Sequence, residues 1–113
     1  MAVNSRRKGA DGERELAHKL NDYGFSTRRS VQYNGKAEDG QADLLGLPGI
    51  HIECKRVEKL NLYDAMAQAI HDAKCREIPS VFHRKNHSEW LVTMRLSDWM
   101  KLYKEYFELV VEK

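Results

Sequence analysis

The chain has 113 residues, of which 42% are hydrophobic and 32% charged, and a net charge of +2, so it has room for one domain with a modest core. No run of 18 or more apolar residues occurs and the N-terminal segment MAVNSRRKGADGERE lacks an apolar stretch; we therefore expect no membrane span, no secretory signal and a cytoplasmic location. The two cysteines, Cys54 and Cys75, are too few for a disulfide scaffold and lack zinc-knuckle spacing, which indicates free thiols.

The first part of the chain predicts a helix, a strand and a loop. Apolar residues recur at three- and four-residue steps between Gly9 and Tyr23, the opposite face is charged, and Gly24 follows as a helix stop. The segment Phe25–Gln32 is rich in Ser, Thr, Val and Arg, which favours a strand. Residues 33–40, YNGKAEDG, predict a flexible loop.

The middle of the chain predicts a β-hairpin. Two apolar runs, Ala42–Leu47 and Ile50–Val57, are separated by a turn at Pro48. Around this turn, positions whose numbers sum to about 96 should lie opposite one another, within one or two residues of register. We therefore expect Asp43 to face Glu53.

The remaining chain predicts two helices and two strands. The expected elements are a helix from Leu60 to Cys75 with Asn61 as its N-cap, strands at Ile78–His83 and Trp90–Met94, and a helix from Ser97, its expected N-cap, to about Phe107. The order indicates an α/β fold with a small mixed sheet of about five strands flanked by helices. We expect residues 1–113 to form one domain, with residues 1–8 as a flexible basic arm and residues 108–113 as a tail.

The segment IHIECKR, residues 50–56, carries the candidate chemistry. Side chains alternate along a strand, so His51, Glu53 and Lys55 share one face while Cys54 points to the core. If the predicted register holds, Asp43 lies about 5 Å from Glu53 between Cβ atoms. Two carboxylates this close repel, which raises the pKa of one or requires a cation between them.

A hard divalent cation fits this pair of carboxylates. Mg²⁺ takes oxygen ligands, needs only one or two protein carboxylates and keeps water for chemistry. Lys55 would then stand beside a water that attacks a phosphodiester, or balance the charge that grows in the transition state. The alternative interpretation is an ordinary ion-pair cluster of Asp43, Glu53 and Lys55 on an exposed sheet face, because Glu-x-Lys is a common tripeptide.

Four segments together resemble a known family. The strings RKGADGERELAHKL, GFSTRRS, QADLLG and HIECKR, in this order, resemble the archaeal-type Holliday-junction resolvases within the PD-(D/E)xK nuclease superfamily. Short resolvase-like nucleases of bacteriophages and prophages are also similar, and share the IPSVFHRKN and WLVT segments. The resemblance covers roughly residues 6–107 and implies a restriction-endonuclease-like fold.

The resemblance also implies roles for individual residues. Asp43 and Glu53 would be the principal metal ligands, Lys55 the catalytic lysine and Glu13 a further active-site carboxylate at the metal or its waters. Gln68 matches a glutamine beside the site in related nucleases, although it could equally be an ordinary exposed residue. The Cys54 carbonyl matches a further metal ligand. Ala42 departs from the expected proline, which changes backbone shape and removes no ligand.

Glu13 and Glu15 compete for the same assignment on the first helix. Helix geometry places them about 200° apart, so we expect only one to face the sheet, and the resemblance selects Glu13. Without the resemblance, both are simply solvated charges.

Basic residues predict contacts with DNA phosphates. Residues 1–36 hold eight basic groups against four acidic ones, which could meet a polyanion. A loop bearing His83, Arg84, Lys85 and His87 fits phosphate contact better than a zinc pair, because no further Cys or His lies near. The expected DNA-binding residues are Arg6, Arg7, Lys8, Lys36, Arg56, Arg84 and Lys85. The resemblance adds Arg29 and Ser30, because a Ser or Arg of the matching segment lies near the scissile phosphate in that family.

These expectations combine into a Mg²⁺-dependent endonuclease, with Mn²⁺ as a substitute and no small-molecule cofactor, that acts on branched DNA as a homodimer. Aromatic residues on the last helix occupy more than one stripe and could face a partner subunit, or serve only as half of the core. The alternatives are a nuclease that nicks linear, flapped or single-stranded DNA, a catalytically silent DNA-binding module with the same fold, and an enzyme acting on RNA.

Overall fold

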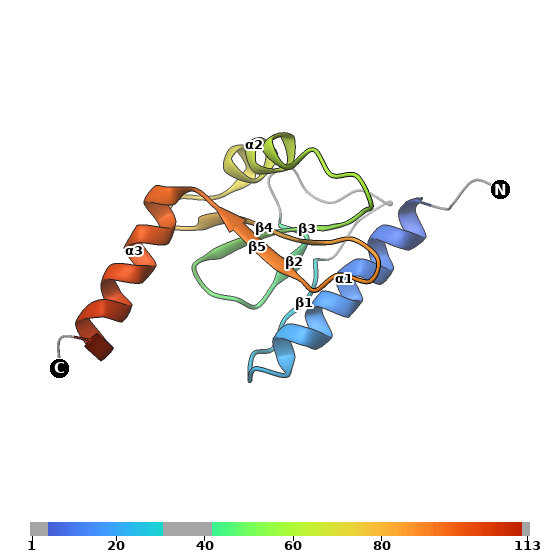
Figure 1. The fold of residues 1–113 in the computed structure, drawn as a ribbon. Coiled ribbons are helices and arrows are strands. Elements are labelled where there is room, and N and C mark those ends of the chain that lie inside the picture. The colour runs from blue at the N-terminus through green and yellow to red at the C-terminus, as the bar shows by residue number, and fades with distance from the viewer. Residues whose placement is uncertain (1–4, 31–41, 112–113) are drawn as a thin grey trace.

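The computed structural model describes residues 5–30 and 42–111, and its elements follow the predicted order (Figure 1). The elements are α1 (Ser5–Asn21), β1 (Arg28–Arg29), β2 (Leu44–Leu45), β3 (Ile50–Arg56), α2 (Leu62–Asp72), β4 (Ile78–Arg84), β5 (Leu91–Met94), α3 (Leu96–Tyr106) and a π-helical turn, η1 (Phe107–Val111). The predicted loop at residues 33–40 and the end of the predicted strand Phe25–Gln32 lie outside the described residues.

The five strands form one mixed sheet in the order β1-β2-β3-β4-β5. Only β3 and β4 run parallel, and α2 is the crossover between them. In the hairpin, Leu44 pairs with Ile52, two positions that sum to 96, and the predicted register is therefore confirmed. The Asp43 amide also donates to the Ile52 carbonyl at 2.9 Å. This α/β architecture, a small mixed sheet of five strands with flanking helices, is the predicted fold class.

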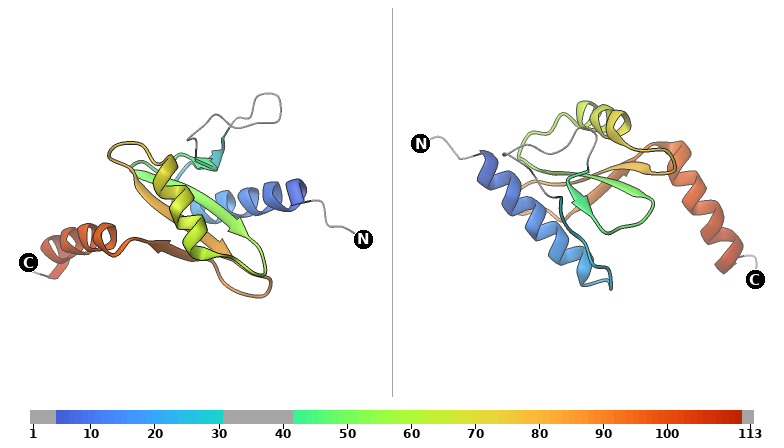
Figure 2. Two further views of the ribbon diagram at one scale, coloured as in Figure 1. Left: turned by 90° about the horizontal axis from the view of Figure 1, so that it is seen from above. Right: turned by 180° about the vertical axis from the view of Figure 1, so that it is seen from behind.

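Helices α1 and α2 cover opposite faces of the sheet, as the views of Figure 2 show. On one face, Leu16 and Ala17 of α1 pack with Leu44, Ile52 and Phe82. On the other face, Ala65, Met66 and Ala69 of α2 pack against Val81. Strand alternation therefore places Ile52 and Cys54 toward α1, and His51, Glu53 and Lys55 toward the face that α2 covers.

Helix α1 begins at Ser5, four residues before the predicted start at Gly9. Arg6, Arg7 and Lys8 are good helix formers, so Gly9 does not prevent the helix from extending through them. Residues 5–8 of the predicted basic arm are therefore part of α1. The first residues, 1–4, lie outside the described part of the chain.

Strands β1 and β2 have two residues each, far fewer than the segments Phe25–Gln32 and Ala42–Leu47 predicted. The chain before β1 is held by α1 instead of by the sheet, because Thr27 bonds to the Asn21 side chain and to the Ala17 carbonyl. Strand β2 ends at Leu45, because the φ of +104° at the next residue, Gly46, is incompatible with a continuing strand. The short strands thus follow from local hydrogen bonds and backbone geometry.

Helix α3 starts differently from the prediction. Its N-cap is Arg95, with no side-chain cap bond, and Ser97 lies within the first turn, so the prediction of Ser97 as the cap is wrong. The first turn is stabilised by the buried Asp98 carboxylate, which accepts from Arg95 Nε at 2.9 Å and pairs with Lys101. The predicted Asn61 cap of α2 is confirmed, because its side chain accepts from the Asp64 amide.

From β5 onward, α3 and η1 extend away from the sheet as a projecting arm (Figures 1 and 2). Residues 108–111, which were predicted as a tail, are helical and belong to η1. None of the helices in the described part of the chain is both long and apolar enough to cross a membrane.

Candidate active site

The Asp43 and Glu53 side chains are brought together by the β2-β3 hairpin. Asp43 directly precedes β2, and its Oδ2 atom accepts a hydrogen bond from the Cys54 amide at 2.8 Å. The Ser30 amide donates to the Asp43 carbonyl at 3.1 Å, so neighbouring backbone on both sides fixes this residue. Glu53 lies at the centre of β3 and is buried, at 5% exposure.

The negative charges of the Asp43 and Glu53 carboxylates repel each other. Burial and the negative charge of Glu53 raise the pKa of Asp43 to about 7, and Glu13 contributes in the same direction. The Cys54 amide and the Lys55 ammonium oppose the rise. Four predicted site residues, Glu13, Asp43, Glu53 and Lys55, therefore lie within electrostatic range of one point.

Glu13 and Lys55 reach this point from different elements. The Glu13 carboxylate is half-buried on α1 and accepts from Arg29 Nε of β1 at 2.7 Å. Lys55 is half-buried on β3 and has no ion pair among the residues that the structure describes. The Lys55 ammonium, which has no ion pair in the described structure, thus lies near the carboxylates of Asp43, Glu53 and Glu13.

This donor set fits a hard divalent cation. Carboxylate oxygens are the ligands that Mg²⁺ and Mn²⁺ prefer, and a cation would relieve the repulsion that raises the pKa of Asp43. Burial and the nearby Asp43 and Glu13 carboxylates raise the pKa of the Cys54 thiol, which disfavours the thiolate form that binds metals. Its side chain packs instead against the core under α1.

Gln68 is exposed on α2 and does not bond directly to the acidic pair. Its Nε2 atom donates to Asp72 Oδ2 at 2.7 Å. Asp72, at the end of α2, lies close to His51 and Glu53: the ligand atoms of these three residues are within 4.8 Å of one another. The sequence analysis did not identify His51 or Asp72 as site residues. No local signal connects them, since Asp72 comes from a helix that the fold alone brings to β3.

Glu15 faces the sheet as well, so the expectation that only one of Glu13 and Glu15 does so is wrong. Its carboxylate binds the Arg84 guanidinium through two oxygens, accepts from Trp90 Nε1 at 3.0 Å and lies 3.8 Å from Arg56 Nε. Helix α1 crosses the sheet, so residues on its two flanks reach different strands: Glu13 reaches β1, and Glu15 reaches β3 and β4. The Arg84 bond holds the pKa of Glu15 below its usual range.

The predicted DNA-binding residues are distributed over this face and its margins. Arg56 and Arg84 turn toward Glu15, Arg29 pairs with Glu13, and Ser30 is buried. Arg7 and Lys85 are exposed and Lys8 is half-buried, whereas the Arg6 side chain and Lys36 lie outside the described part of the structure.

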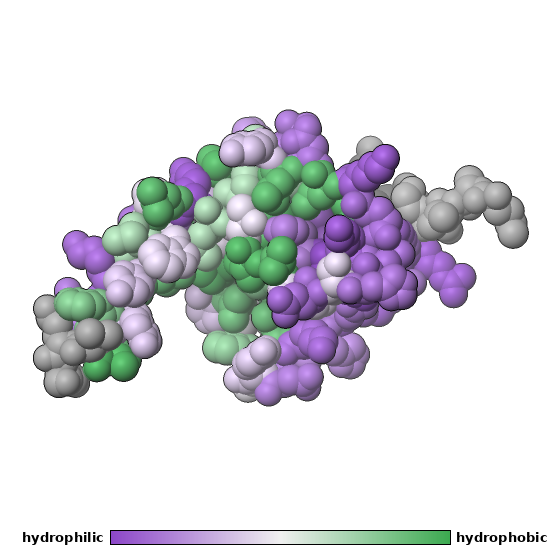
Figure 3. Space-filling model, viewed as in Figure 1, coloured by the Kyte–Doolittle hydropathy of each residue, from purple (hydrophilic) through white to green (hydrophobic). Residues whose placement is uncertain are grey.

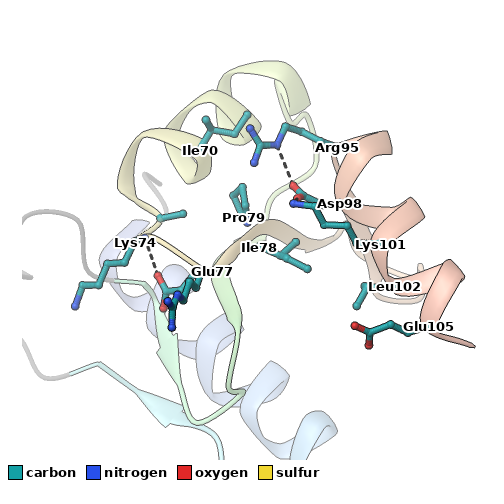
Figure 4. Close-up of a pocket in the computed structure, with 12 residues that line it drawn as sticks. Ile70, Lys74, Glu77, Ile78, Pro79, Arg95, Asp98, Lys101, Leu102 and Glu105 are labelled. Carbon is teal, nitrogen blue, oxygen red and sulfur yellow. Dashed lines mark hydrogen bonds and ion pairs between the residues drawn. The ribbon is translucent and has the colours of Figure 1, made fainter.

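A separate cleft of about 490 Å³ lies between the end of α2, the start of β4 and α3 (Figure 4). None of the predicted site residues lines it. Its charged groups are nearly balanced, and they pair locally, Arg95 with Asp98 and the Lys74 amide with Glu77. The cleft therefore offers no concentrated charge for a phosphate or a cation.

Comparisons with known proteins agree with the fold. The structure is similar to that of Hjc, a Holliday junction resolvase from the archaeal hyperthermophile Archaeoglobus fulgidus, with a TM-score of 0.59 and 23% sequence identity over 77% of this chain and 72% of that chain. No curated protein sequence matches. Residues 4–112 match the family described as phage putative PDDEXK endonuclease. This match spans almost the whole chain, and the protein therefore belongs to that family of PD-(D/E)xK nucleases.

Proposed function

We propose that this protein is a metal-dependent, structure-selective DNA endonuclease that resolves four-way junctions by paired nicks. The observation that carries the proposal is the half-buried Asp43 carboxylate, which is repelled by Glu53 and Glu13 and has the Lys55 ammonium beside it. An arrangement with this electrostatic cost is expected where a cation completes it. Membership of a nuclease family and a fold like that of a Holliday junction resolvase support the same reading.

In this proposal Asp43 and Glu53 hold Mg²⁺, for which Mn²⁺ substitutes, and Glu13 and the Cys54 carbonyl complete the coordination. A cation held by these residues would supply an activated water and neutralise charge on the phosphate. Lys55 orients the attacking water and compensates the negative charge that develops on the phosphate oxygens. The Cys54 amide keeps the Asp43 carboxylate in place through its 2.8 Å hydrogen bond.

The DNA backbone would be held by basic groups around the acidic site. Arg29 already lies against Glu13, so its guanidinium is placed to meet the scissile phosphate. The exposed Lys85, together with Arg6, Arg7, Lys8 and Lys36, supplies further phosphate contacts. Arg56 and Arg84 are engaged by Glu15, so we expect them to act mainly by shaping the surface.

A homodimer would provide the two sites that paired nicks require. A four-way junction has two-fold symmetry, and a two-fold dimer presents two equivalent sites to it. The exposed aromatic and aliphatic side chains of β5 and α3 offer a surface for such contact. In Figure 3, green hydrophobic residues lie among paler ones over these elements.

A cleavage assay tests the function directly. A synthetic four-way junction and a linear duplex of matched sequence are incubated with the protein and Mg²⁺, and we expect the junction to be cut faster, by paired nicks. Equal rates on both substrates would reject junction selectivity, and cleavage of a matched RNA junction instead of DNA would reassign the substrate.

Two variants test the assigned residues. Asp43→Asn and Lys55→Ala should abolish cleavage while junction affinity stays within about tenfold, because neither removes the basic contacts. Lys59→Ala, which removes an exposed lysine shortly after β3, is the matched control and should cleave normally. A wild-type protein that binds junctions without cutting them under any divalent cation would identify a binding module instead.

A further inference from the structure

A second group of potential ligands lies beside the proposed catalytic pair. The side chains of His51, Glu53 and Asp72 place one nitrogen and two oxygen atoms within 4.8 Å of one another. His51 and Glu53 come from β3, on the face opposite α1, and Asp72 closes the group from the last position of α2. His51 is 1% exposed and Glu53 is 5% exposed, so water cannot freely solvate these charges.

The buried His51 ring has no short hydrogen bond at either nitrogen within the described residues. Its Nε2 atom is 3.4 Å from Glu53 Oε1, and its Nδ1 atom is 3.8 Å from Glu77 Oε1. Both distances exceed the usual 2.7–3.2 Å of a strong N–H···O bond. Two ligand atoms on a tetrahedral Zn²⁺ with bonds of about 2.1 Å lie about 3.4 Å apart. The His51-Glu53 separation therefore already matches two ligands of one metal ion.

The surroundings favour a cation and orient the third ligand. The Asp72 carboxylate is held by Gln68 Nε2 at 2.7 Å and His71 Nδ1 at 2.9 Å, which is how ligating carboxylates are commonly supported. The group sits at the C-terminal end of α2, where the helix dipole carries partial negative charge. Glu77 Oε1 accepts from the Lys74 amide at 2.8 Å and lies 3.8 Å from His51 Nδ1, on the other side of the ring from Glu53.

We propose that His51, Glu53 and Asp72 form a second cation site, distinct from the Asp43-Glu53 pair, that takes a transition metal such as Zn²⁺. An imidazole with two carboxylates suits Zn²⁺, whereas Mg²⁺ prefers oxygen ligands alone. Three protein ligands leave the fourth position to water. Glu53 belongs to both sites, so it joins a transition-metal site to the proposed Mg²⁺ site.

Zinc binding to the full-length protein tests this site without any cleavage assay. Isothermal titration with Zn²⁺ is performed in excess Mg²⁺, and Co²⁺ absorption reports on tetrahedral coordination. We expect Zn²⁺ to bind the wild type, and Asp72→Asn to weaken binding at least tenfold. Asp64→Asn, which removes an exposed carboxylate from the first turn of the same helix, is the matched control and should bind like the wild type.

The other variants separate this proposal from the proposed nuclease function. Asp43→Asn should retain Zn²⁺ binding even though it is expected to lose cleavage. His51→Gln should lose Zn²⁺ binding, with a melting curve to confirm that the variant folds. The second site is overturned if the wild type does not bind Zn²⁺, if Asp72→Asn binds as tightly as Asp64→Asn, or if Asp43→Asn alone removes binding.

Discussion

Among single residues, Asp43 has a strongly unfavourable electrostatic environment for its charged form. Its pKa is raised from 3.8 to about 7, first by burial and then by the charge of Glu53, so the folded protein favours the neutral carboxyl. A raised pKa stabilises the fold below the unfolded-state pKa, and this contribution disappears as the pH rises through about 7. Without a cation, ionised Asp43 therefore destabilises the protein at alkaline pH.

Asp43→Asn should consequently stabilise the metal-free protein at pH 8, by about 1–3 kcal/mol, and have little effect at pH 4. The asparagine oxygen can still accept the Cys54 amide, so the gain reports the removed charge. Thermal melts in the presence of a chelator, at both pH values, measure it. A variant less stable than the wild type at pH 8 would contradict the assignment of charge repulsion at Asp43.

Glu15 is the opposite case, because its charge is satisfied by Arg84, Arg56 and Trp90. Glu15→Gln leaves two guanidinium groups without their anion, one of them with a buried Nε atom, and should cost about 1–3 kcal/mol of unfolding free energy. Urea denaturation measures the loss. Asp11→Asn, which removes an exposed partner of Arg14, should change stability by less than about 0.5 kcal/mol, and similar losses in both variants would refute the special role of Glu15.

The sequence alone predicts which residues lie opposite one another only within the β2-β3 hairpin. The turn at Pro48 and two apolar runs suffice to place Asp43 opposite Glu53, because antiparallel register is determined locally. Glu15 and Asp72 find their partners through contacts far along the chain, such as Glu15 with Arg84. Periodicity identifies the face of a helix and gives no information about which strand that face meets.

At the scale of elements, the sheet edge formed by β1 and β2 depends on the backbone just before β1 and just after β2. Gly46 follows β2 with a φ of +104°, and a Cβ atom there would lie 2.3 Å from the Ser26 carbonyl oxygen. Backbone atoms cannot give way as a flexible side chain does. The close approach of the Gly46 backbone to the chain before β1 therefore requires the absence of a side chain.

Gly46→Ala should destabilise the protein by about 3 kcal/mol or more, since it combines a steric clash with a strained backbone. Gly24→Ala is the matched control: its φ is +99°, but no atom lies within 4 Å of the added Cβ, so only about 1 kcal/mol of strain is expected. Chemical denaturation of both variants compares them. Equal losses would show that strain, and not the contact with Ser26, makes glycine necessary at position 46.

Element boundaries illustrate what periodicity leaves undetermined. The start of α1 at Ser5 and the two-residue lengths of β1 and β2 depend on Thr27 bonding back to α1 and on the backbone at Gly46. The types and order of the elements are set by longer apolar patterns, and these were predicted correctly. The crossover α2 between parallel strands also explains how a helix end reaches the acidic face of β3.

On the scale of the whole molecule, the arm formed by α3 and η1 exposes apolar side chains that no other part of the described chain covers. Trp99 and Tyr103 stack with ring centroids 5.2 Å apart, and they remain 48% and 41% exposed. An isolated helix of 11 residues is marginal in water, so its stability needs packing on another surface. Exposed apolar patches of this kind mark sites of protein association.

We therefore expect a dimer in solution, as the proposed function requires, with Tyr103 at its interface. Tyr103→Glu places a charge within the aromatic stripe and should shift the protein toward the monomer, measured by sedimentation velocity over a concentration series. Phe25→Glu changes an aromatic residue that is 47% exposed just before β1, at the opposite edge of the sheet from β5, and should leave the dimer intact. In the same samples, the Tyr103 variant should convert paired nicks in a junction into single nicks. A wild-type monomer, or a Tyr103→Glu variant that remains dimeric, would remove the arm from the proposed interface, because a buried charge opposite an apolar partner cannot leave the association unchanged.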